Sequence, residues 1–174
     1  MNCGDLELAF DFATSAYRSR GAVRDLIHNF KYNKQTHLRH LLGRMLREGF
    51  GDARVRSVGI DGLVPVPLHP AREREREFNQ AAVLASVVAK RLRLPVEHGL
   101  RRIRHTATQT HYHREERFQN LEGAFALRRG ASLAGRNLAL VDDVLTTGST
   151  ADACARVLKA AGASAVIVIT VARG

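Results

Sequence analysis

An α/β fold with a largely parallel sheet is predicted by the C-terminal third of this 174-residue chain. The apolar run Leu138–Val141 reads as a buried strand, and residues 149–163 carry apolar side chains at helical spacing. The last segment, SAVIVITVARG, is apolar throughout, as expected for a parallel strand that is buried on both faces. Strand, helix and strand in this order form a βαβ unit, which is typical of α/β proteins. The chain length suits one domain with its own hydrophobic core.

The N-terminal part of the chain is predicted to be helical. Apolar residues recur at helical spacing in two segments between residues 21 and 46, and the pattern breaks around Tyr32–Thr36. We therefore expect two helices with a short basic connector. Further along, Val58–Ile60 and Leu63–Val66 predict a strand that ends early in a turn, because Pro65 and Pro67 cannot donate to a sheet ladder.

The middle of the chain contains one clear helix between two polar stretches. The stretch AREREREF alternates Arg and Glu and is interpreted as a solvated helix face or a loop. A helix follows from Asn79, a plausible N-cap, and is expected to stop at Pro95. The segment from about residue 101 to 118 is polar and rich in Arg and His, and long polar segments inside compact domains are usually functional or mobile.

The charge balance of the chain points to anionic partners. Lys and Arg number 27 against 17 Asp and Glu, which gives a formal net charge of +10. A basic domain of this size favours nucleic acid, nucleotides, phosphates or an acidic partner, although a general compositional bias toward Arg is the simpler alternative.

Cysteine usage and hydropathy exclude several other classes. The two cysteines, Cys3 and Cys154, are far apart and belong to no CxxC pair, so neither a zinc ribbon nor a disulfide framework is expected. The N-terminus lacks the pattern of a signal peptide, and the longest apolar run is too short to span a bilayer. We expect a cytoplasmic protein without membrane contact.

The stretch LALVDDVLTTGST, residues 138–150, carries the strongest chemical signal. In open α/β sheets, ligands bind beyond the carboxyl ends of the strands, which is where Asp142 and Asp143 are expected. The following turn, rich in Thr, Ser and Gly, leads into a helix whose N-terminal N–H groups and dipole favour an anion, and Gly148 allows a close backbone approach. Carboxylates instead suit sugar hydroxyls or a bound Mg²⁺. The motif therefore predicts a ribose-5-phosphate site.

Two other structures could produce part of this pattern. An acid pair at a strand end followed by an ordinary Ser/Thr helix cap would look similar. The ordered combination of strand, acid pair, turn and helix favours the ligand site. A P-loop is excluded because the Lys and the GxxxxGK spacing are missing.

The same stretch resembles the phosphoribosyl pyrophosphate (PRPP) motif of type I phosphoribosyltransferases. Three further stretches, GAVRDLIHNFKY, LVPVPLHPARERERE with the following FNQAAVLA, and RRIRHTATQTHYHREERFQNLEGAF, resemble the ComF family. The resemblance covers nearly the whole chain from about Tyr17. It implies the type I phosphoribosyltransferase fold, a central mainly parallel sheet flanked by helices with a small N-terminal hood. The hood would occupy residues 1–56 and the PRPP-binding core residues 57–174 of a single domain.

The resemblance also implies roles for individual residues. Asp142 and Asp143 would bind the ribose hydroxyls of PRPP. Its 5′-phosphate would be held by Thr146, Thr147, Gly148, Ser149 and Thr150. The pyrophosphate loop would include Leu68, His69, Arg72 and Arg76, with Arg74 as another candidate. A flexible loop over about residues 101–118 would contribute Arg104, Arg114 and Arg117. Lys31 and Tyr32 would lie in the hood, where the acceptor is selected.

The sequence departs from the ComF pattern at two points. ComF-type proteins commonly carry an N-terminal Cys₄ zinc ribbon, and here Cys3 alone could be its remnant. The family usually reads Arg-Gly-Phe-Asn-Gln, whereas Glu77 replaces that glycine here. A glycine in such a turn often marks a positive φ or close contact with an anion.

Two functions follow from the resemblance. The first is a Mg²⁺-dependent phosphoribosyltransferase that transfers phosphoribosyl from PRPP to an unidentified acceptor, with a nucleobase favoured and a link to natural competence and DNA uptake. Mg²⁺ would be bound through PRPP, with no protein ligand assigned. The alternative is a non-catalytic PRPP- or nucleotide-sensing module that binds single-stranded DNA or a competence helicase. The acceptor base and the oligomeric state, monomer or homodimer, stay open at this point.

Overall fold

A computed structural model describes residues 7–33, 35–105 and 114–174, without the side chains of residues 114, 115 and 117. The main sheet has four strands in the order β1-β6-β5-β2, and every neighbouring pair is parallel. These strands are β1 (Phe12–Arg18), β2 (Gly62–Pro65), β5 (Asn137–Leu145) and β6 (Ala165–Arg173). Two short antiparallel strands, β3 (Leu100–Arg102) and β4 (Phe125–Leu127), form a second sheet.

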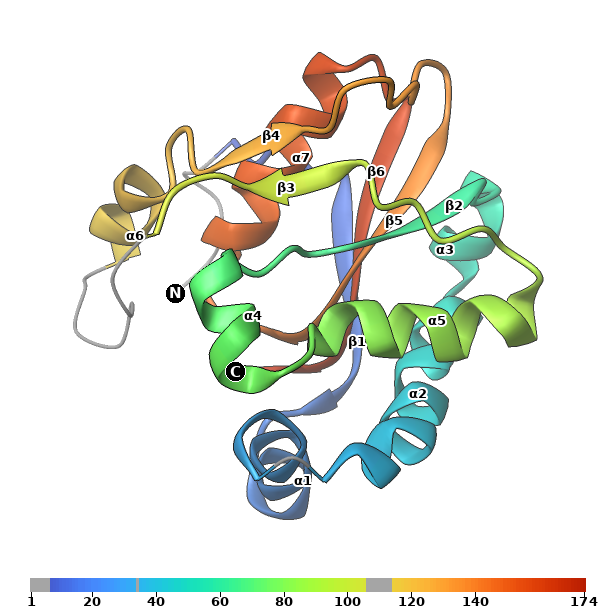
Figure 1. Cartoon of the computed structure of the whole chain (residues 1–174). Helices are drawn as coiled ribbons and strands as arrows, with labels where there is room; N and C mark the ends of the chain where they lie inside the picture. Colours follow the sequence, from blue (N-terminus) through green and yellow to red (C-terminus); the bar gives the residue numbers. More distant parts are fainter. Residues whose placement is uncertain (1–6, 34, 106–113) are drawn as a thin grey trace.

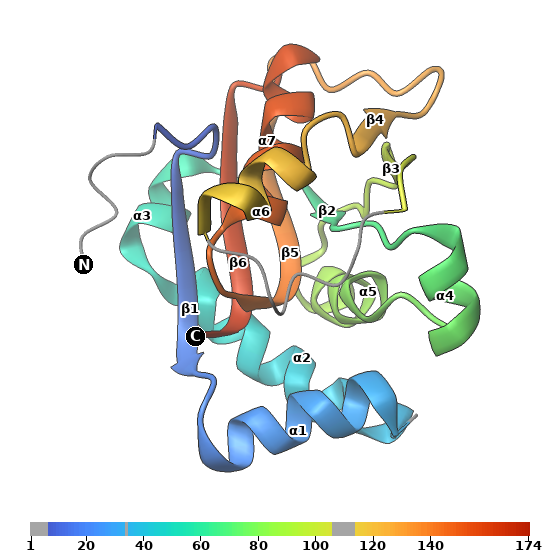
Figure 2. The same ribbon diagram turned by 90° about the vertical axis from the view of Figure 1, so that its left-hand side faces the viewer.

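Helices cover both faces of the main sheet (Figures 1 and 2). The helices are α1 (Gly21–Tyr32), α2 (Arg39–Glu48), α3 (Ala53–Val58), α4 (Pro70–Arg76), α5 (Gln80–Leu92), α6 (Arg114–Asn120) and α7 (Ser149–Ala160). Short 3₁₀ turns, η1 (Thr36–Leu38) and η2 (Gly49–Gly51), flank α2. The predicted α/β fold with a parallel sheet is confirmed.

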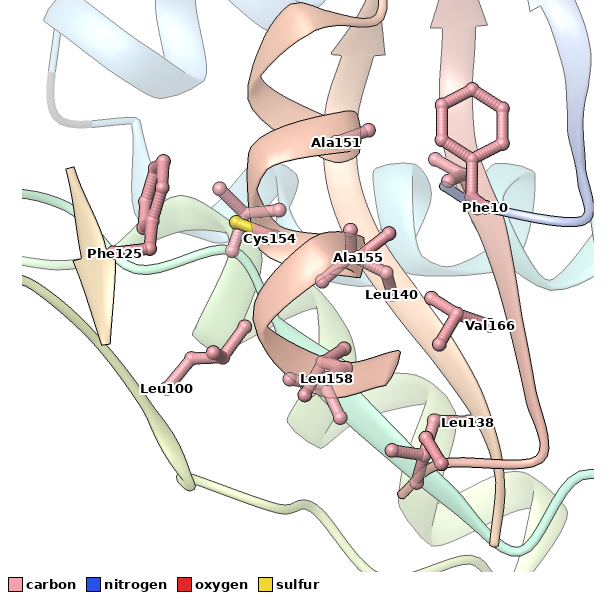
Figure 3. Packing of buried hydrophobic residues seen from close by; sticks show 14 of the residues in the cluster. Phe10, Leu100, Phe125, Leu138, Leu140, Ala151, Cys154, Ala155, Leu158 and Val166 are labelled. Carbon is pink, nitrogen blue, oxygen red and sulfur yellow. The ribbon is translucent and has the colours of Figure 1, made fainter. Parts of the chain in front are cut away.

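Strand alternation divides the hydrophobic core into two layers. Side chains at successive strand positions point to opposite faces, so Leu138 and Leu140 of β5 pack under α7 with Leu158 (Figure 3). Ala139 and Val141 face the other layer, which α1, α2 and α5 cover. This alternation continues to the end of β5 and decides which way the two aspartates point.

The predicted cap of α5 is found in the structure, and α5 and α7 end at left-handed residues. The side chain of Asn79 accepts a hydrogen bond from the Ala82 amide at 3.1 Å and caps α5. Gly162 has a φ of +90° just after α7, the left-handed conformation expected of a glycine that ends a helix. Arg93, also left-handed, ends α5 before Pro95 is reached.

Three sequence interpretations differ from the structure. Val58–Ile60 is not a strand: α3 extends to Val58, and Gly59 ends it in a left-handed conformation. The side chain of Asp52 accepts from the Arg54 amide at 2.9 Å and starts that helix locally. β1 was not predicted, because a strand of small and polar residues lacks a strong apolar pattern.

The third difference concerns the segment 101–118, which is partly regular rather than a continuous loop. β3 and α6 lie at its two ends, and residues 106–113 lie outside the described residues. In the part of the chain that is described, no helix has the length and apolar character needed to cross a membrane.

Candidate functional site

The carboxyl end of β5, the turn after it and the start of α7 form the candidate site. Gly148 adopts a φ of +83° and a ψ of −6° immediately before the first helical residue. A side chain with a Cβ is strained in this conformation, so the turn from strand to helix depends on glycine here. The predicted phosphate turn therefore leads directly into a helix N-terminus.

The turn is held by a small number of polar contacts. The hydroxyls of Thr147 and Ser149 lie 3.1 Å apart, and the Gly174 amide donates to the Leu145 carbonyl at 2.9 Å. The first amides of a helix have no intrahelical acceptor, so they point out of the end of α7. Asp152 in the first turn would oppose an anion, but its carboxylate accepts from Arg156 Nε and from the Ala9 amide.

A small cavity of about 40 Å³ opens at this turn. It is lined by the end of β5, the turn and the start of α7, including Asp142 and all five predicted phosphate-binding residues, Thr146, Thr147, Gly148, Ser149 and Thr150. Asp142 and the turn therefore line the same small cavity.

The two aspartates point to opposite faces of the sheet. β5 extends through both of them, and Asp142 pairs in register with Thr170 of β6. Asp142 lies on the α7 side, where it interacts electrostatically with Arg102 and Cys154. Asp143 is 2 % exposed and lies on the α1 side. The sequence placed the acids beyond the strand, and the structure places them within it.

Lys31 of α1 forms an ion pair with Asp143. The Lys31 side chain is 19 % exposed. Burial alone would lower the pKa of Lys31, but the carboxylates of Asp143 and Asp142 outweigh it and raise the pKa overall. The second oxygen of Asp143 accepts from the Val144 amide at 2.9 Å. Asp143 is therefore already engaged by the protein, and the N-terminal segment contacts the acid pair directly.

The electrostatics of Asp142 differ from those of an ordinary carboxyl group. Burial and the neighbouring Asp143 carboxylate raise the pKa of Asp142 to about 8, and Lys31 only partly opposes this. The amide of Asp143 donates to Asp142 Oδ1 at 2.9 Å. A ligand that donates hydrogen bonds or brings positive charge would favour the ionised form.

The predicted pyrophosphate loop joins β2 to α4. Leu68 leads into it, and the Nδ1 atom of His69 accepts from the Ala71 amide at 3.3 Å and caps α4. The ring of His69 meets that of His105 edge-on, with centroids 4.9 Å apart. Desolvation, followed by the charges of His105, Arg102 and Arg74, lowers the pKa of His69. The neutral imidazole is favoured in this cationic surrounding.

Arg76 contacts the N-terminal segment rather than the rest of the predicted loop. Its guanidinium lies 4.9 Å from the ring centroid of Tyr32 and donates to the Tyr32 hydroxyl at 3.2 Å. Phe30 and Phe78 pack nearby, with ring centroids 5.2 Å apart. The structure therefore brings the predicted hood residues Lys31 and Tyr32 to two different parts of the predicted site.

Arg102 is a candidate that the sequence did not single out. It lies on β3, its pKa is lowered by burial and then by Arg72, and it interacts with Asp142. Its guanidinium stacks over Phe125 at 5.4 Å. Arg102 therefore places positive charge near Asp142, and Arg72 lies close enough to Arg102 to interact with it. In the sequence, Arg102 is one of many arginines in a polar segment, so only the pairing of β3 with β4 distinguishes it.

The flexible-loop residues divide between described and undescribed positions. Arg104 donates to the Glu122 carbonyl at 2.5 Å, which ties the start of the segment to the turn before β4. The side chains of Arg114 and Arg117 lie outside the described residues, although the backbone of both belongs to α6.

The described residues contain no cluster of three or more His, Cys, Asp or Glu side chains that could hold a metal ion alone. The acid pair still fits Mg²⁺ bound mostly through a ligand, because Mg²⁺ commonly takes one or two carboxylates plus substrate phosphates. Burial, and then the Asp143 carboxylate, raise the pKa of Asp142, and a cation bound nearby would favour its ionised form.

A parallel sheet with a polar, Gly-containing turn at a strand end defines the class of α/β proteins that bind ligands at that edge. Residues 79–174 match the phosphoribosyl transferase domain. The chain belongs to this family, and the predicted type I fold is confirmed.

The chain is similar to curated proteins linked by name to competence and DNA utilization. It is 34 % identical over 152 residues to "Competence protein F" of Haemophilus influenzae, covering 85 % of this chain and 66 % of that protein. It is 36 % identical over 145 residues to "DNA utilization protein YhgH" of Salmonella typhi, covering 81 % and 63 %. The predicted relationship to the ComF family is thereby confirmed. The chain spans about two thirds of the length of these relatives.

Among solved structures, the chain resembles the glutamine PRPP amidotransferase from B. subtilis complexed with ADP and GMP. The TM-score is 0.47 and the identity 23 %, over 75 % of this chain and 25 % of that one.

Proposed function

We propose that this protein binds PRPP and transfers its phosphoribosyl group to an acceptor, with a nucleobase as the favoured class. The observation that carries the proposal is the cavity that Asp142 shares with the Thr146–Thr150 turn at the N-terminus of α7. An anionic phosphate fits the helix end, and a hydroxylated ring fits the adjacent carboxylate.

The proposed reaction needs positioning and charge neutralisation rather than a protein nucleophile. The bond between ribose C1 and the pyrophosphate oxygen breaks, a bond from C1 to an acceptor nitrogen forms, and the acceptor loses a proton. The turn would hold the 5′-phosphate while Asp142 accepts a hydrogen bond from a ribose hydroxyl. Arg72 and Arg102 would stabilise the charge that develops on pyrophosphate.

Mg²⁺ would be held by PRPP oxygens with Asp142 or Asp143 close by, and it would neutralise the leaving group when bound. For Asp143 to take part, Lys31 must share or release its carboxylate, because the two are paired in the free protein. Asp142, on the cavity side, is the more direct candidate for the ribose.

Calorimetry with PRPP, with and without Mg²⁺, tests the binding step. We expect binding that Mg²⁺ strengthens and that the Asp142→Asn, Asp143→Asn double variant abolishes. Asp61→Asn is the control, since Asp61 lies at the opposite end of β5 and accepts from the Asn137 amide at 2.8 Å. Equal PRPP affinity in the wild type and the double variant would refute the proposal.

The alternative, a non-catalytic PRPP- or nucleotide-sensing module, is supported by the names of the relatives, which refer to competence and DNA utilization. In this role the basic chain would bind single-stranded DNA or a helicase. Pyrophosphate release in a screen of nucleobases separates the two functions. Pyrophosphate release in the presence of any one base supports the transferase. PRPP binding with no pyrophosphate release in the presence of any base supports the sensor.

A further inference from the structure

A basic groove with an apolar floor runs between α2 and α5, away from the cavity at β5. Two cavities of about 350 and 640 Å³ form it, and they are adjacent because His40, Val87 and Arg91 line both. α2 and α5 pack against each other along this face, with the α4–α5 junction at one end (Figures 1 and 2). We call this feature the α2–α5 groove.

The floor of the groove is aliphatic. Val83 and Val87 lie one helical turn apart on α5, and Phe78 lines the end near α4. Val87 and Val83 are both partly exposed, although each packs against the core layer beneath α5 or against α2. The groove therefore offers an apolar stripe to an incoming partner.

The rim of the groove carries five exposed cations with no acidic partner among the described residues. Three lie on α2 and two on α5: Arg39, Arg44, Arg47, Lys90 and Arg91. Exposed cations elsewhere do find acids, as in Arg54–Asp52 at 2.7 Å and Arg156–Asp152 at 2.8 Å. Of the residues that line the two cavities, Glu73 at the α4 end is the one acid.

We propose that the α2–α5 groove binds an acidic amphipathic helix of a partner protein. Such a helix presents an apolar stripe flanked by acids, which complements a Val-lined floor between two basic rims. The groove lies between two helices, a geometry into which the ridge of a third helix packs. This proposal is independent of PRPP binding.

Single-stranded nucleic acid fits the groove less well. Binding of single strands relies on aromatic side chains on which bases stack. The lining offers valines and two aromatic rings, His40 and Phe78, and Phe78 already packs against Phe30. The rim charges would attract phosphates, but one imidazole gives successive bases little stacking surface.

Fluorescence anisotropy with a labelled synthetic peptide tests the proposal. A helix that matches the length of α5 needs about 14 residues for about 20 Å. The probe carries Leu at i, i+3, i+4 and i+7, Glu on both flanks and Ala elsewhere. A peptide of the same composition with scrambled Leu positions and a single-stranded oligonucleotide are compared with it. We expect the amphipathic probe to bind at least tenfold more tightly than the scrambled peptide, on the order expected for a lost apolar stripe.

Two groove variants locate the binding site. Arg44→Glu with Arg47→Glu should weaken probe binding by about tenfold or more. Val83→Thr with Val87→Thr, which keeps side-chain shape, should weaken it by a similar factor. Arg128→Glu with Arg129→Glu changes the net charge equally at exposed positions outside the groove and should leave affinity within about twofold. Thermal melts confirm that each variant is folded.

Several results would overturn the proposal. These are absence of probe binding, equal affinity for the scrambled peptide, and a larger loss in the Arg128/Arg129 variant than in the rim variant. Tighter binding of the oligonucleotide that is lost in the rim variant would assign the groove to nucleic acid instead.

Discussion

At the scale of single residues, Asp142 should make stability depend on pH. Its folded-state pKa is raised to about 8 from 3.8, so between these values the folded protein holds a proton that the unfolded chain has lost. Stability must then fall as pH rises through this window, by up to about 1.4 kcal/mol per pH unit. Asp142→Asn removes the titrating group, and its urea midpoint should change little between about pH 5 and pH 8.

The pH experiment has a matched control. Asp11 has a pKa lowered by its bonds to Val166 and Lys159 in spite of burial, so its stabilising effect is complete above its ordinary value and is lost only in acid. Asp11→Asn should therefore keep the wild-type slope in the same window. If Asp142→Asn keeps that slope too, Asp142 is not the group responsible.

Glu77, at the end of α4, has a φ of +68°, a conformation that is strained for a residue with a Cβ. The ComF pattern that the chain resembles has glycine at this position, and glycine adopts a left-handed conformation freely. Glu77→Gly should stabilise the protein by about 1 kcal/mol, since only a residue without Cβ adopts this conformation freely. Chemical denaturation measures the change. Glu77→Ala keeps the Cβ and should give no such gain, and Glu75→Gly within the helix should destabilise by about 1 kcal/mol.

At the scale of elements, the contact between α2 and α5 depends on Gly43. A Cβ at this position would lie 2.5 Å from Val87 Cγ1 and 3.0 Å from Val87 Cβ. Gly43→Ala should therefore force the two helices apart and destabilise the protein by about 1–3 kcal/mol. Adding Val87→Ala removes Cγ1, the nearer of the two atoms, and should recover part of this loss, which the thermal midpoint measures.

Gly51 provides the control for that pair. A Cβ there meets no atom within 4 Å, so Gly51→Ala should be neutral or slightly stabilising. Equal losses from the Gly43 and Gly51 changes would show that the close approach of α2 to α5 is not the cause.

At the scale of the whole molecule, the sequence predicted the fold where the pattern was strong. The apolar β5 and β6 and the amphipathic α7 between them give the parallel sheet directly. β1 was missed because its parallel pairing with β6 joins residues about 155 positions apart, and its own residues show little alternation. Local patterns report local structure, whereas such pairing depends on the whole sheet.

The candidate site was predictable only in part for the same reason. The turn from Thr146 to Thr150 follows from one continuous motif. That β5 continues through the acids, so that Asp142 and Asp143 diverge, depends on pairing with β6. Lys31 and Arg102 interact with Asp143 and Asp142 from segments that are distant in the sequence, and no local pattern predicts these contacts.

The Lys31–Asp143 ion pair joins the N-terminal segment to the core of the molecule. Asp143 is almost fully buried, so removing Lys31 alone leaves an uncompensated charge, and Lys31→Met should cost about 3 kcal/mol of folding free energy. Asp143→Asn alone leaves the ammonium group without its partner and should also destabilise. The double variant removes both charges and should be more stable than the sum of the two losses implies, because no buried charge remains.

A double-mutant cycle by urea denaturation measures this coupling, and the exposed Lys159–Asp11 pair is its control. That pair has side chains 30 % and 44 % exposed, so its coupling should stay below about 1 kcal/mol. A Lys31–Asp143 coupling no larger than the control would contradict the contact seen here. A larger coupling would mean that any ligand that binds the Asp143 carboxylate must also replace the interaction that Lys31 loses. Binding of the phosphoribosyl donor would then depend on the position of α1.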